Sequence, residues 1–425
     1  MKIFLLFLGL LIPSIVTLSA FAEPSIKDDN FIVQKYVTEI CCSPTTMTFE
    51  GKDILILQKD SGNVILIRDG KQQNSTVHEN ITNTGEQGML GITTVGSKVY
   101  LYFTESSKQW GPPLGKRVYS YDWNGQSFVN RTLIKDLSQT QFYHNGGAMV
   151  TSKNGSVFLV VGDAGRYGKL ENHRDGEPDD TGVILRIAPP GQYYAMGIRN
   201  SFGLAFDPVT GNLWDTENGP DFGDEVNIVP PNFNSGWDVI MGPANSTQLA
   251  NLPGFPGYVY HDPQFTWTKT VAPTGLSFIN SKEFEKYKNS LFVGDCNNGN
   301  LYRFELNSQR DGFVFNSVQL TDKVVNIGDS MDEIIFGTGF GCITDVKQGP
   351  DGLLYIVSLS DGTIYRIVPK DLTVQSGIGF SQIQYAVYVV AASIAAISVT
   401  YVIKIRRKNN QKSESLVSNV FSEII

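Results

Sequence analysis

Residues 53–70 read DILILQKDSGNVILIRDG, and this stretch shows the unit from which most of the chain is built. Two runs rich in Ile, Leu and Val flank a short polar segment, and apolar runs separated by turn residues are typical of a β-hairpin. The same organisation recurs as KVYLYFTESS (98–107) with RVYSYDWNG (117–125), SVFLVVGDAG (156–165) with GVILRIAP (182–189), NLWDTENGP (212–220) with EVNIVP (225–230), SLFVGDCNNGNLYRFEL (290–306), and LLYIVSLSDGTIYRIVP (353–369).

Six such units without sustained helical periodicity predict an all-β fold over residues 31–370. Repeated hairpins are best accommodated by a six-bladed β-propeller, which closes on itself and hides its strand edges. A pair of β-sandwiches is the alternative. In a propeller the loops converge over the central channel, so we expect the binding site there.

The two ends of the chain carry targeting signals. Lys2, an apolar run and Ala-Phe-Ala (20–22) predict a secretory signal peptide over residues 1–22. Residues 383–403 are almost wholly apolar and long enough to cross a bilayer, which takes roughly 20 residues. Basic residues follow directly, and positive charge marks the cytoplasmic side. We therefore expect a linker (371–382), a transmembrane helix (383–405) and a cytoplasmic tail (406–425), with the propeller outside the cell; a buried core helix is the alternative for 383–403.

Composition limits the kinds of partner. The net charge is −8 and no basic stripe appears, which argues against nucleic acid. Sequons fit an exported surface, and they occur at Asn74, Asn80, Asn130, Asn154 and Asn245.

Only four cysteines occur, too few for a disulfide scaffold, so the hydrophobic core must hold the fold. In a propeller, Cys296 and Cys342 would border one pocket, and Cys41-Cys42 would lie next to the last blade. We expect a disulfide that joins Cys41 or Cys42 to Cys342 or Cys296. A thiolate site for a metal with His144 is the alternative, although the spacing is no metal signature.

The segment GIRNSFGLAFDPVTGNLWDTENGPDFGDEVN (197–227) concentrates polar chemistry at strand ends. LAF (204–206) and NLW (212–214) are expected strands on either side of a turn. Arg199 and Asn200 then lie just before one strand, and Glu217–Pro220 just after the next. Strand-end loops are where a rigid sheet displays functional groups, although Asp, Asn and Gly are also simple turn formers.

Several ordered motifs resemble those of the soluble quinoprotein glucose, aldose and sorbosone dehydrogenases. They are EQGMLG (86–91), HNGG (144–147), GDAGR (162–166), GIRN (197–200), ENGP (217–220), DEVN (224–227), TVAP (270–273) and DVKQGPDG (345–352). The resemblance covers most of residues 35–370. It implies a six-bladed propeller that uses pyrroloquinoline quinone and calcium to oxidise the anomeric hydroxyl of a sugar. The product would be a lactone, and the electrons would pass to an unidentified acceptor at the cell surface.

The resemblance also assigns the catalytic and metal-binding residues. His144 matches the general base, and an imidazole with a pKa near 6.5 can accept a proton at neutral pH. Gly219 and Pro220 match the calcium ligands, through backbone carbonyls that suit a hard cation without adding charge. Three acidic side chains nearby could bind the ion directly or through water, although each could equally be a solvated loop acid; they are Asp221, Asp224 and Glu225.

Further positions match cofactor contacts. A guanidinium suits a carboxylated quinone, which assigns Arg199, and Asn200 accompanies it. Glu86 falls where the family has a polar residue near substrate and cofactor, and Thr270 opens the TVAP motif. Trp267 lies just ahead of that motif, where an aromatic ring usually covers the cofactor, although core packing is an equal alternative.

Three expected cations are missing. The family's Arg-x-Arg is Cys342-Ile-Thr344 here, and a family Lys is Asn297. Each lost charge-assisted hydrogen bond to an anion costs about 1.5–3 kcal/mol. Lys269 could compensate, and the acid that the family has before His144 is Tyr143. These departures favour a second hypothesis, a non-catalytic surface propeller that binds a glycan, a metal or a protein. The retained His144, Arg199 and Gly-Pro turn favour the enzyme, which we take as the leading hypothesis.

Overall fold

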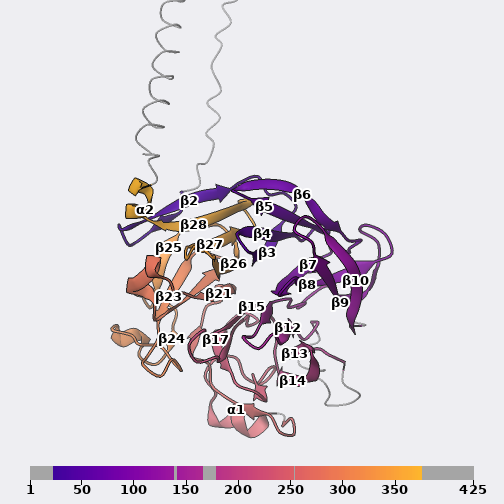
Figure 1. Ribbon diagram of the computed structural model, residues 1–425. Helices are drawn as coiled ribbons and strands as arrows, with labels where there is room; N and C mark the ends of the chain where they lie inside the picture. Colours follow the sequence, from indigo (N-terminus) through magenta and orange to yellow (C-terminus); the bar gives the residue numbers. More distant parts are fainter. Residues whose placement is uncertain (1–22, 138–140, 166–178, 253, 376–425) are drawn as a thin grey trace, which may run out of the picture. The chain divides into compact units, whose positions relative to one another are not determined.

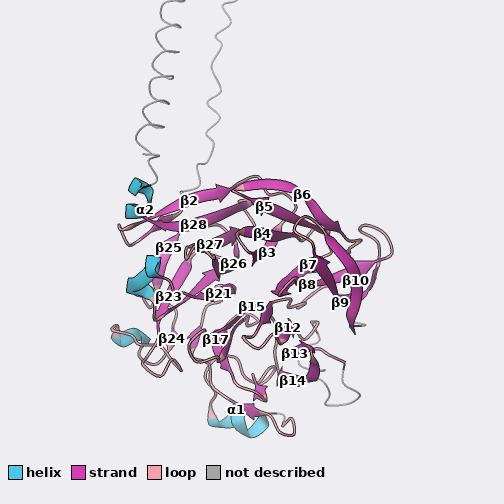
Figure 2. Cartoon of the chain, viewed as in Figure 1, coloured by secondary structure: helices cyan, strands magenta, loops and turns pink. Residues whose placement is uncertain are grey.

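The computed structural model describes residues 23–137, 141–165, 179–252 and 254–375. These residues form six β-sheets with a few short helical turns (Figure 2). The sheets belong to the first of two compact units, which ends at Val368. The predicted signal peptide, transmembrane helix and cytoplasmic tail lie outside the described residues, and within the described part no helix is long and apolar enough to cross a membrane.

All six predicted hairpins are confirmed as antiparallel strand pairs. They are β4 (Asp53–Gln58) with β5 (Asn63–Arg68), β8 (Lys98–Ser106) with β9 (Pro113–Trp123), β12 (Val157–Val161) with β13 (Val183–Ala188), β16 (Leu213–Glu217) with β17 (Asp224–Val229), β22 (Ser290–Asp295) with β23 (Leu301–Glu305), and β27 (Leu354–Ser358) with β28 (Thr363–Pro369).

Each hairpin is preceded in its sheet by one inner strand. These are β3 (Pro44–Glu50), β7 (Met89–Val95), β11 (Met149–Thr151), β15 (Ser201–Phe206), β21 (Pro273–Phe278) and β26 (Ile343–Gln348). Each inner strand contacts the next one in this series, and β26 contacts β3, so the strands close a ring (Figure 1). This arrangement confirms the predicted all-β propeller and excludes the pair of sandwiches.

The outer edges of the sheets are formed by further strands. They are β6 (Lys71–His78), β10 (Phe128–Leu137), β14 (Pro190–Met196), β18 (Phe233–Asn234), β19 (Val259–Tyr260), β20 (Phe265–Trp267), β24 (Val324–Val325) and β25 (Ile335–Thr338). The N-terminal strand β2 (Phe31–Val37) lies beside β28, so the first and last parts of the propeller share one sheet. Backbone hydrogen bonds therefore close the ring. A shorter strand, β1 (Ser25–Ile26), pairs with β25.

Helical structure is confined to short segments. They are α1 (Ser246–Asn251), α2 (Lys370–Gln375) and the 3₁₀ turns Lys282–Tyr287 and Val318–Leu320. The helix α2 covers the first residues of the predicted linker.

The hairpin strands read as nearly continuous apolar runs because neighbouring sheets cover both of their faces. All five residues of β12, VFLVV, are buried. In β4 every residue after Asp53 is buried as well. Strict alternation of apolar and polar residues is typical of a sheet with one face exposed to solvent. The continuous apolar runs here instead indicate strands that are buried on both faces.

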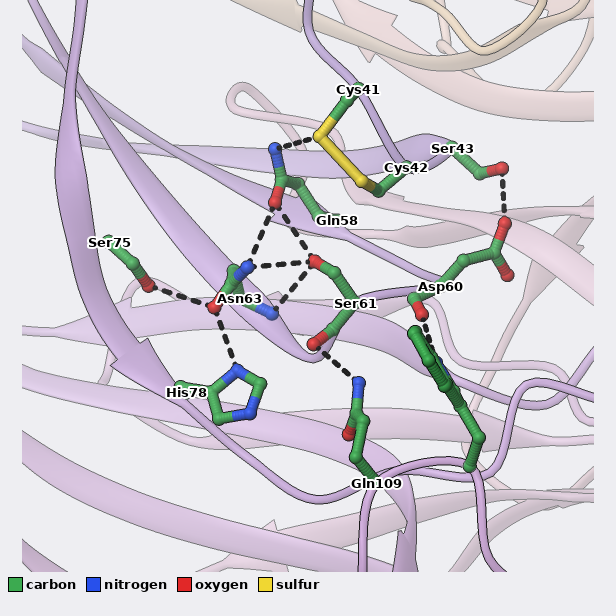
Figure 3. Close-up of a disulfide and its surroundings, with 11 residues drawn as sticks. Cys41, Cys42, Ser43, Gln58, Asp60, Ser61, Asn63, Ser75, His78 and Gln109 are labelled. Carbon is green, nitrogen blue, oxygen red and sulfur yellow. Dashed lines mark hydrogen bonds between the residues drawn. A yellow bond between two sulfur atoms is a disulfide. The ribbon is translucent and has the colours of Figure 1, made fainter.

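The disulfide prediction was wrong. Cys296, directly after β22, pairs with Cys342, directly before β26, while Cys41 pairs with its neighbour Cys42. The Cys296 N–H donates to the Ala272 carbonyl at 3.0 Å, which fixes its loop against the adjacent strand end. Figure 3 shows the Cys41–Cys42 bond, where the Gln58 amide donates to Cys41 Sγ at 3.3 Å. Because all four cysteines are in disulfides, a thiolate metal site with His144 is excluded.

A buried ion pair ties two neighbouring sheets together. Asp207, in the turn after β15, accepts hydrogen bonds from Arg310 Nε at 2.7 Å and Nη2 at 2.8 Å. The two side chains are 0% and 8% exposed, respectively. Burial raises the pKa of Asp207, but the hydrogen bonds from Arg310 outweigh it and hold the pKa below its ordinary value. The pair is therefore charged and fully engaged.

Removing Arg310 should leave the Asp207 carboxylate buried without its main partner. We expect Arg310→Met to lower the free energy of unfolding of the full chain by about 3–5 kcal/mol, measured by urea denaturation. Arg68→Met is the matched control, because Arg68 makes the same two-pronged contact with Asp53 but is 45% exposed. The control should cost far less, because exposed ion pairs contribute little, and equal losses in both variants would contradict this role of burial.

The two disulfides should contribute unequally to stability. The Cys296–Cys342 bond closes a loop across 46 positions, whereas Cys41–Cys42 joins adjacent residues. Chain entropy then predicts a loss of about 4 kcal/mol for the Cys296→Ser, Cys342→Ser double variant. The Cys41–Cys42 bond closes no loop, so the Cys41→Ser, Cys42→Ser variant should lose far less free energy of unfolding. Chemical unfolding of both full-length variants measures the difference, and a larger loss for the adjacent pair would refute the loop-entropy account.

Candidate functional site

A cavity of about 330 Å³ lies on the ring axis, at the end where the inner strands begin. Every inner strand contributes a residue at or just before its start to the lining. The lining residues are Thr45, Thr46, Lys59, Glu86, Leu90, Gly146, Ala148, Phe202, Asn218, Ala272, Thr274, Cys296, Cys342, Thr344 and Leu359. Cys296 and Cys342 thus border one pocket, as predicted. A larger cavity of about 640 Å³, lined in part by Glu23, Glu39 and Asp361, contains none of the predicted site residues.

His144 lies in the loop before β11, two residues before Gly146, which lines the axial cavity; His144 itself, Arg199 and Asn200 are not among the lining residues. Its Nδ1 lies 2.5 Å from Asp163 Oδ1, and the two side chains are 14% and 0% exposed. A Cβ on Gly162 would lie 2.5 Å from the His144 carbonyl oxygen, so only glycine allows the loop after β12 to approach this closely. With Nδ1–H donated to the carboxylate, the lone pair of the ring is on Nε2, which can accept a proton.

Asp163 is the functional residue that sequence reasoning missed. It comes from the GDAGR motif, not from the position before the histidine. Its Oδ2 accepts from the Trp237 indole at 2.7 Å, and Gly165 N–H donates to Oδ1 at 2.8 Å. Burial raises the pKa of Asp163, but the hydrogen bonds, led by that to His144, lower it below its ordinary value. Asp163 is thus a carboxylate that orients the imidazole.

Glu86 and Asn200 join the histidine loop to neighbouring sheets. Glu86 Oε2 accepts from the Asn145 N–H at 2.9 Å and lies 3.3 Å from the Asn200 amide nitrogen. Asn200 Oδ1 in turn accepts from the Gly146 N–H at 3.0 Å. The structure therefore brings Glu86, His144 and Asn200 together, as the sequence predicted.

Arg199 lies below this loop, among carboxylates. Its Nη1 donates to the Asn218 carbonyl at 2.7 Å, and its guanidinium carbon lies 5.2 Å from the centre of the Trp237 ring. The Nε atom is buried and has no hydrogen-bond partner. Burial lowers the pKa of Arg199, and the charges of Asp163 and Glu217 oppose this effect. One donor of a buried cation is thus left for a ligand.

Buried acids line the strand pair that follows Arg199. Glu217 and Glu225 face each other across β16 and β17, with Asp215 two residues along. Glu217 accepts from the Arg199 N–H at 2.6 Å and the Ser235 hydroxyl at 2.5 Å. The Asp215 carboxylate is buried, with the side chains of Asn227 and Ser201 beside it. Burial raises the pKa of Glu217 to about 7 and the pKa values of Asp215 and Glu225 well above their ordinary range.

The predicted calcium ligands lie on the loop between these strands. Asp224 accepts from the N–H groups of Gly219 at 2.8 Å and Val271 at 2.6 Å, so its carboxylate shapes the loop instead of facing outward. Gly219 is buried and Pro220 is exposed. Within the described residues, no group of three or more His, Cys, Asp or Glu side chains is arranged to hold a metal. A calcium site here would therefore depend on backbone carbonyls.

Trp267 does not reach the cavity. It is 1% exposed and packs among core rings, with centroids 5.0 Å from Phe265 and 5.2 Å from Tyr302. The alternative of core packing is correct, because Trp267 belongs to an outer strand. Thr270 is half-buried, and its carbonyl is 3.4 Å from the Asn297 amide nitrogen.

The cavity wall is mostly uncharged. Thr344 donates to the Pro44 carbonyl at 3.2 Å, and the Cys296–Cys342 disulfide lies in the same wall. Lys269 is exposed and does not line the cavity. Lys59 is the lysine in the lining, and it already pairs with Asp60 at 2.8 Å. Of these two lysines, only Lys59 lines the cavity.

The sequence matches the family described as Glucose / Sorbosone dehydrogenase over residues 42–366. It is 29% identical over 244 residues to aldose sugar dehydrogenase YliI of Escherichia coli (strain K12), covering 54% of this chain and 61% of that protein. It is 23% identical over 280 residues to quinoprotein glucose dehydrogenase B of Acinetobacter calcoaceticus, covering 54% and 58%. The chain thus spans less than two thirds of the length of these relatives.

Solved structures share the fold. The soluble aldose sugar dehydrogenase of Escherichia coli, in its apo form, aligns with a TM-score of 0.61 and 21% identity, over 80% of this chain and 100% of that chain. The PQQ-bound form of aldose sugar dehydrogenase from Streptomyces coelicolor aligns with a TM-score of 0.59 and 21% identity, over 81% and 99%. At these identities the likeness establishes the propeller fold alone.

The raised pKa of Glu217 predicts how stability depends on pH. A carboxyl whose pKa rises on folding, here from 4.5 to about 7, holds its proton more tightly in the folded chain. Its contribution is full below the unfolded pKa and is lost as pH rises through the folded pKa. Between pH 4.5 and 8, the free energy of unfolding should fall by about 3 kcal/mol on account of Glu217.

Urea unfolding of the full chain across this pH range measures the effect, and Glu217→Gln should flatten the slope. Glu285→Gln is the control, because that side chain is 69% exposed and should leave the slope as it is. An identical slope in the parent and the Glu217 variant would show that Glu217 does not titrate in this range.

Proposed function

Since the chain belongs to the glucose/sorbosone dehydrogenase family, we propose that it is an extracellular, membrane-anchored sugar dehydrogenase that uses pyrroloquinoline quinone and calcium. The observation that carries this proposal is the His144–Asp163 pair, in the loop that leads to Gly146 in the cavity lining. A buried carboxylate on one ring nitrogen and a free lone pair on the other is the arrangement that a general base requires.

In the proposed reaction, His144 Nε2 accepts the proton of the anomeric hydroxyl of an aldose. Asp163 keeps the imidazole in the required tautomer and stabilises the imidazolium that forms. Glu86 and Asn200, which already bind the histidine loop, orient the sugar hydroxyls. A bound quinone would supply the acceptor for the hydride that leaves the anomeric carbon, and the oxidised sugar would be released as its lactone.

Buried polar atoms without partners support a cofactor beside this base. Arg199 Nε is buried and has no hydrogen-bond partner. The Asn145 side chain is 0% exposed, and neither of its two polar atoms has a partner. Leaving such groups unpaired is costly, which is expected where a ligand completes them. Arg199 and Asn145 would hold a carboxylate and a carbonyl of the quinone. The opposite wall, with Thr344 and the Cys296–Cys342 disulfide, would contribute contact without charge.

Calcium is proposed on the backbone carbonyls of Gly219 and Pro220. The support comes from Asp224, which accepts from the Gly219 N–H and so engages the amide side of this loop and leaves its carbonyls for a ligand. Oxygen ligands that add no charge suit a hard cation.

The remaining parts of the proposal concern architecture and location. Each of the six sheets would form one blade, and residues 383–405 would cross the cell membrane with the C-terminus in the cytoplasm. The electrons would leave to an acceptor at the cell surface. Thr270 would support the cofactor from the loop before β21, since Asn297 holds its carbonyl.

The neutral cavity wall favours a second candidate function. A propeller without the family's full set of cations could bind a glycan, a metal or a protein without oxidising it. This candidate predicts that sugars or other ligands bind while the quinone does not.

The test is quinone-dependent dye reduction by the full chain with aldoses, in the presence of calcium. We expect His144→Asn to lower kcat by roughly 10²–10⁴-fold, because general base catalysis contributes about that factor. Asp163→Asn should lower kcat less and shift the pH profile, as expected for a positioning residue. Arg199→Met should weaken quinone binding. Binding of the parent chain too weak to detect at high micromolar quinone would favour the non-catalytic candidate.

A further inference from the structure

Exposed aromatic side chains lie in loops at the same end of the sheets as the axial cavity. Among the described residues, the large exposed hydrophobic side chains include four aromatic ones. They are Trp110 (65% exposed), Phe142 (40%), Tyr143 (56%) and Phe222 (52%). The β8–β9, β10–β11 and β16–β17 loops lie at this end because strands in each sheet alternate in direction. Scattered single residues need no explanation, but rings held beside residues of the cavity lining do.

Three of these rings lie along one continuous edge. The segment 81–87, which carries Glu86, is held between two aromatic loops. On one side the Trp110 N–H donates to the Ile81 carbonyl at 2.7 Å, and on the other the Glu86 N–H donates to the Phe142 carbonyl at 3.0 Å. Tyr143 follows Phe142 with ring centroids 4.2 Å apart, and His144 comes next. We call Trp110, Phe142 and Tyr143 the aromatic rim.

The rim is held in place and not loosely exposed. The Trp110 indole donates to the Asp60 carbonyl at 2.8 Å, which presents the ring beside Lys59 and Asp60. The Gln109 amide donates to the Ser61 carbonyl at 2.8 Å and steadies the same loop. The exposed Cys41–Cys42 disulfide adds apolar surface nearby, since the Asp60 N–H donates to the Cys42 carbonyl at 3.1 Å. Rigid rings beside polar groups form an amphipathic platform.

We propose that the aromatic rim binds the following sugar units of an extended saccharide whose reducing end enters the axial cavity. The inference rests on the proposed function for the sugar at His144. The sugar rings of a linear saccharide have apolar C–H faces and hydroxyl edges. Aromatic faces pack on the former, and the Lys59, Asp60 and Gln109 side chains suit the latter. The substrate class is therefore an oligosaccharide or the end of a polysaccharide, and not a free monosaccharide alone.

A binding experiment without turnover tests this inference separately from the proposed function. Cellotetraose reduced to its alditol cannot be oxidised at the anomeric carbon, so its binding to the full, enzymatically deglycosylated chain can be measured by calorimetry without quinone. We expect binding that weakens about tenfold in Trp110→Ala with Phe142→Ala, because two stacking contacts are lost. The single variant Trp110→Phe retains a ring face, so it should bind the alditol with most of the affinity of the parent chain. Leu133→Ala is the control, since Leu133 is 48% exposed on the outer strand β10.

The kinetic readout is the ratio of kcat/KM for cellotetraose to that for glucose, which should fall about tenfold in the double variant. Rim-dependent binding without any sugar oxidation would support the rim and refute the proposed enzyme. Oxidation of glucose with no binding of the alditol, or with equal binding by parent and double variant, would refute the rim and leave the enzyme standing. Rim-dependent flotation with phosphatidylcholine vesicles, without saccharide binding, would also overturn the inference in favour of a membrane contact.

Discussion

The structure depends on the closure of a ring whose inner strands all begin at the same end. Backbone pairing of β2 with β28 places the two ends of the propeller in one sheet, and contacts between β26 and β3 complete the circle. Because of this closure, residues as far apart in sequence as Thr45 and Thr344 line one cavity. The site is therefore a property of the closed ring. No single sheet contains it, and loosening the seam would separate groups that no local interaction holds together.

Electrostatics inside the ring are arranged around one cation. Arg199 is surrounded by Asp163, Glu217 and the carbonyl of Asn218, and burial makes each of these contacts stronger than it would be in water. Asp163 is kept ionised by three hydrogen bonds, while burial favours the protonated form of Glu217. Two carboxyl groups near one guanidinium thus differ in protonation at neutral pH. Such separation of neighbouring carboxyl groups is typical of functional sites.

Local patterns predicted the elements well, and long-range partners poorly. All six hairpins could be identified because each has two apolar runs around a turn, as at 53–70. The family motifs predicted that His144, Glu86 and Asn200 come together, and the structure shows Glu86 and Asn200 hydrogen-bonded to the histidine loop. The orienting acid could not be found from the position before His144, since Asp163 reaches the ring from a loop nineteen residues later. The GDAGR motif was the available signal, but its role appears only when two loops meet in space.

The disulfide and Trp267 show the same limit. Any pairing among four cysteines was chemically acceptable, and the choice depended on which strand ends lie side by side in neighbouring sheets. Trp267 is close to the TVAP motif in sequence, yet it belongs to an outer strand and points into the core. Sequence proximity to a motif is thus no measure of proximity to a site when a loop reverses the chain.

The Cys296–Cys342 bond has a consequence for biogenesis. It lies in the cavity wall where the family resemblance led us to expect basic side chains, so part of the binding surface is covalent cross-link. That surface exists only after oxidation, which secreted proteins undergo in an oxidising compartment and cytosolic proteins do not. A chain retained in a reducing compartment carries two thiols in place of this wall. Completion of this cavity wall therefore depends on the redox conditions under which the chain folds.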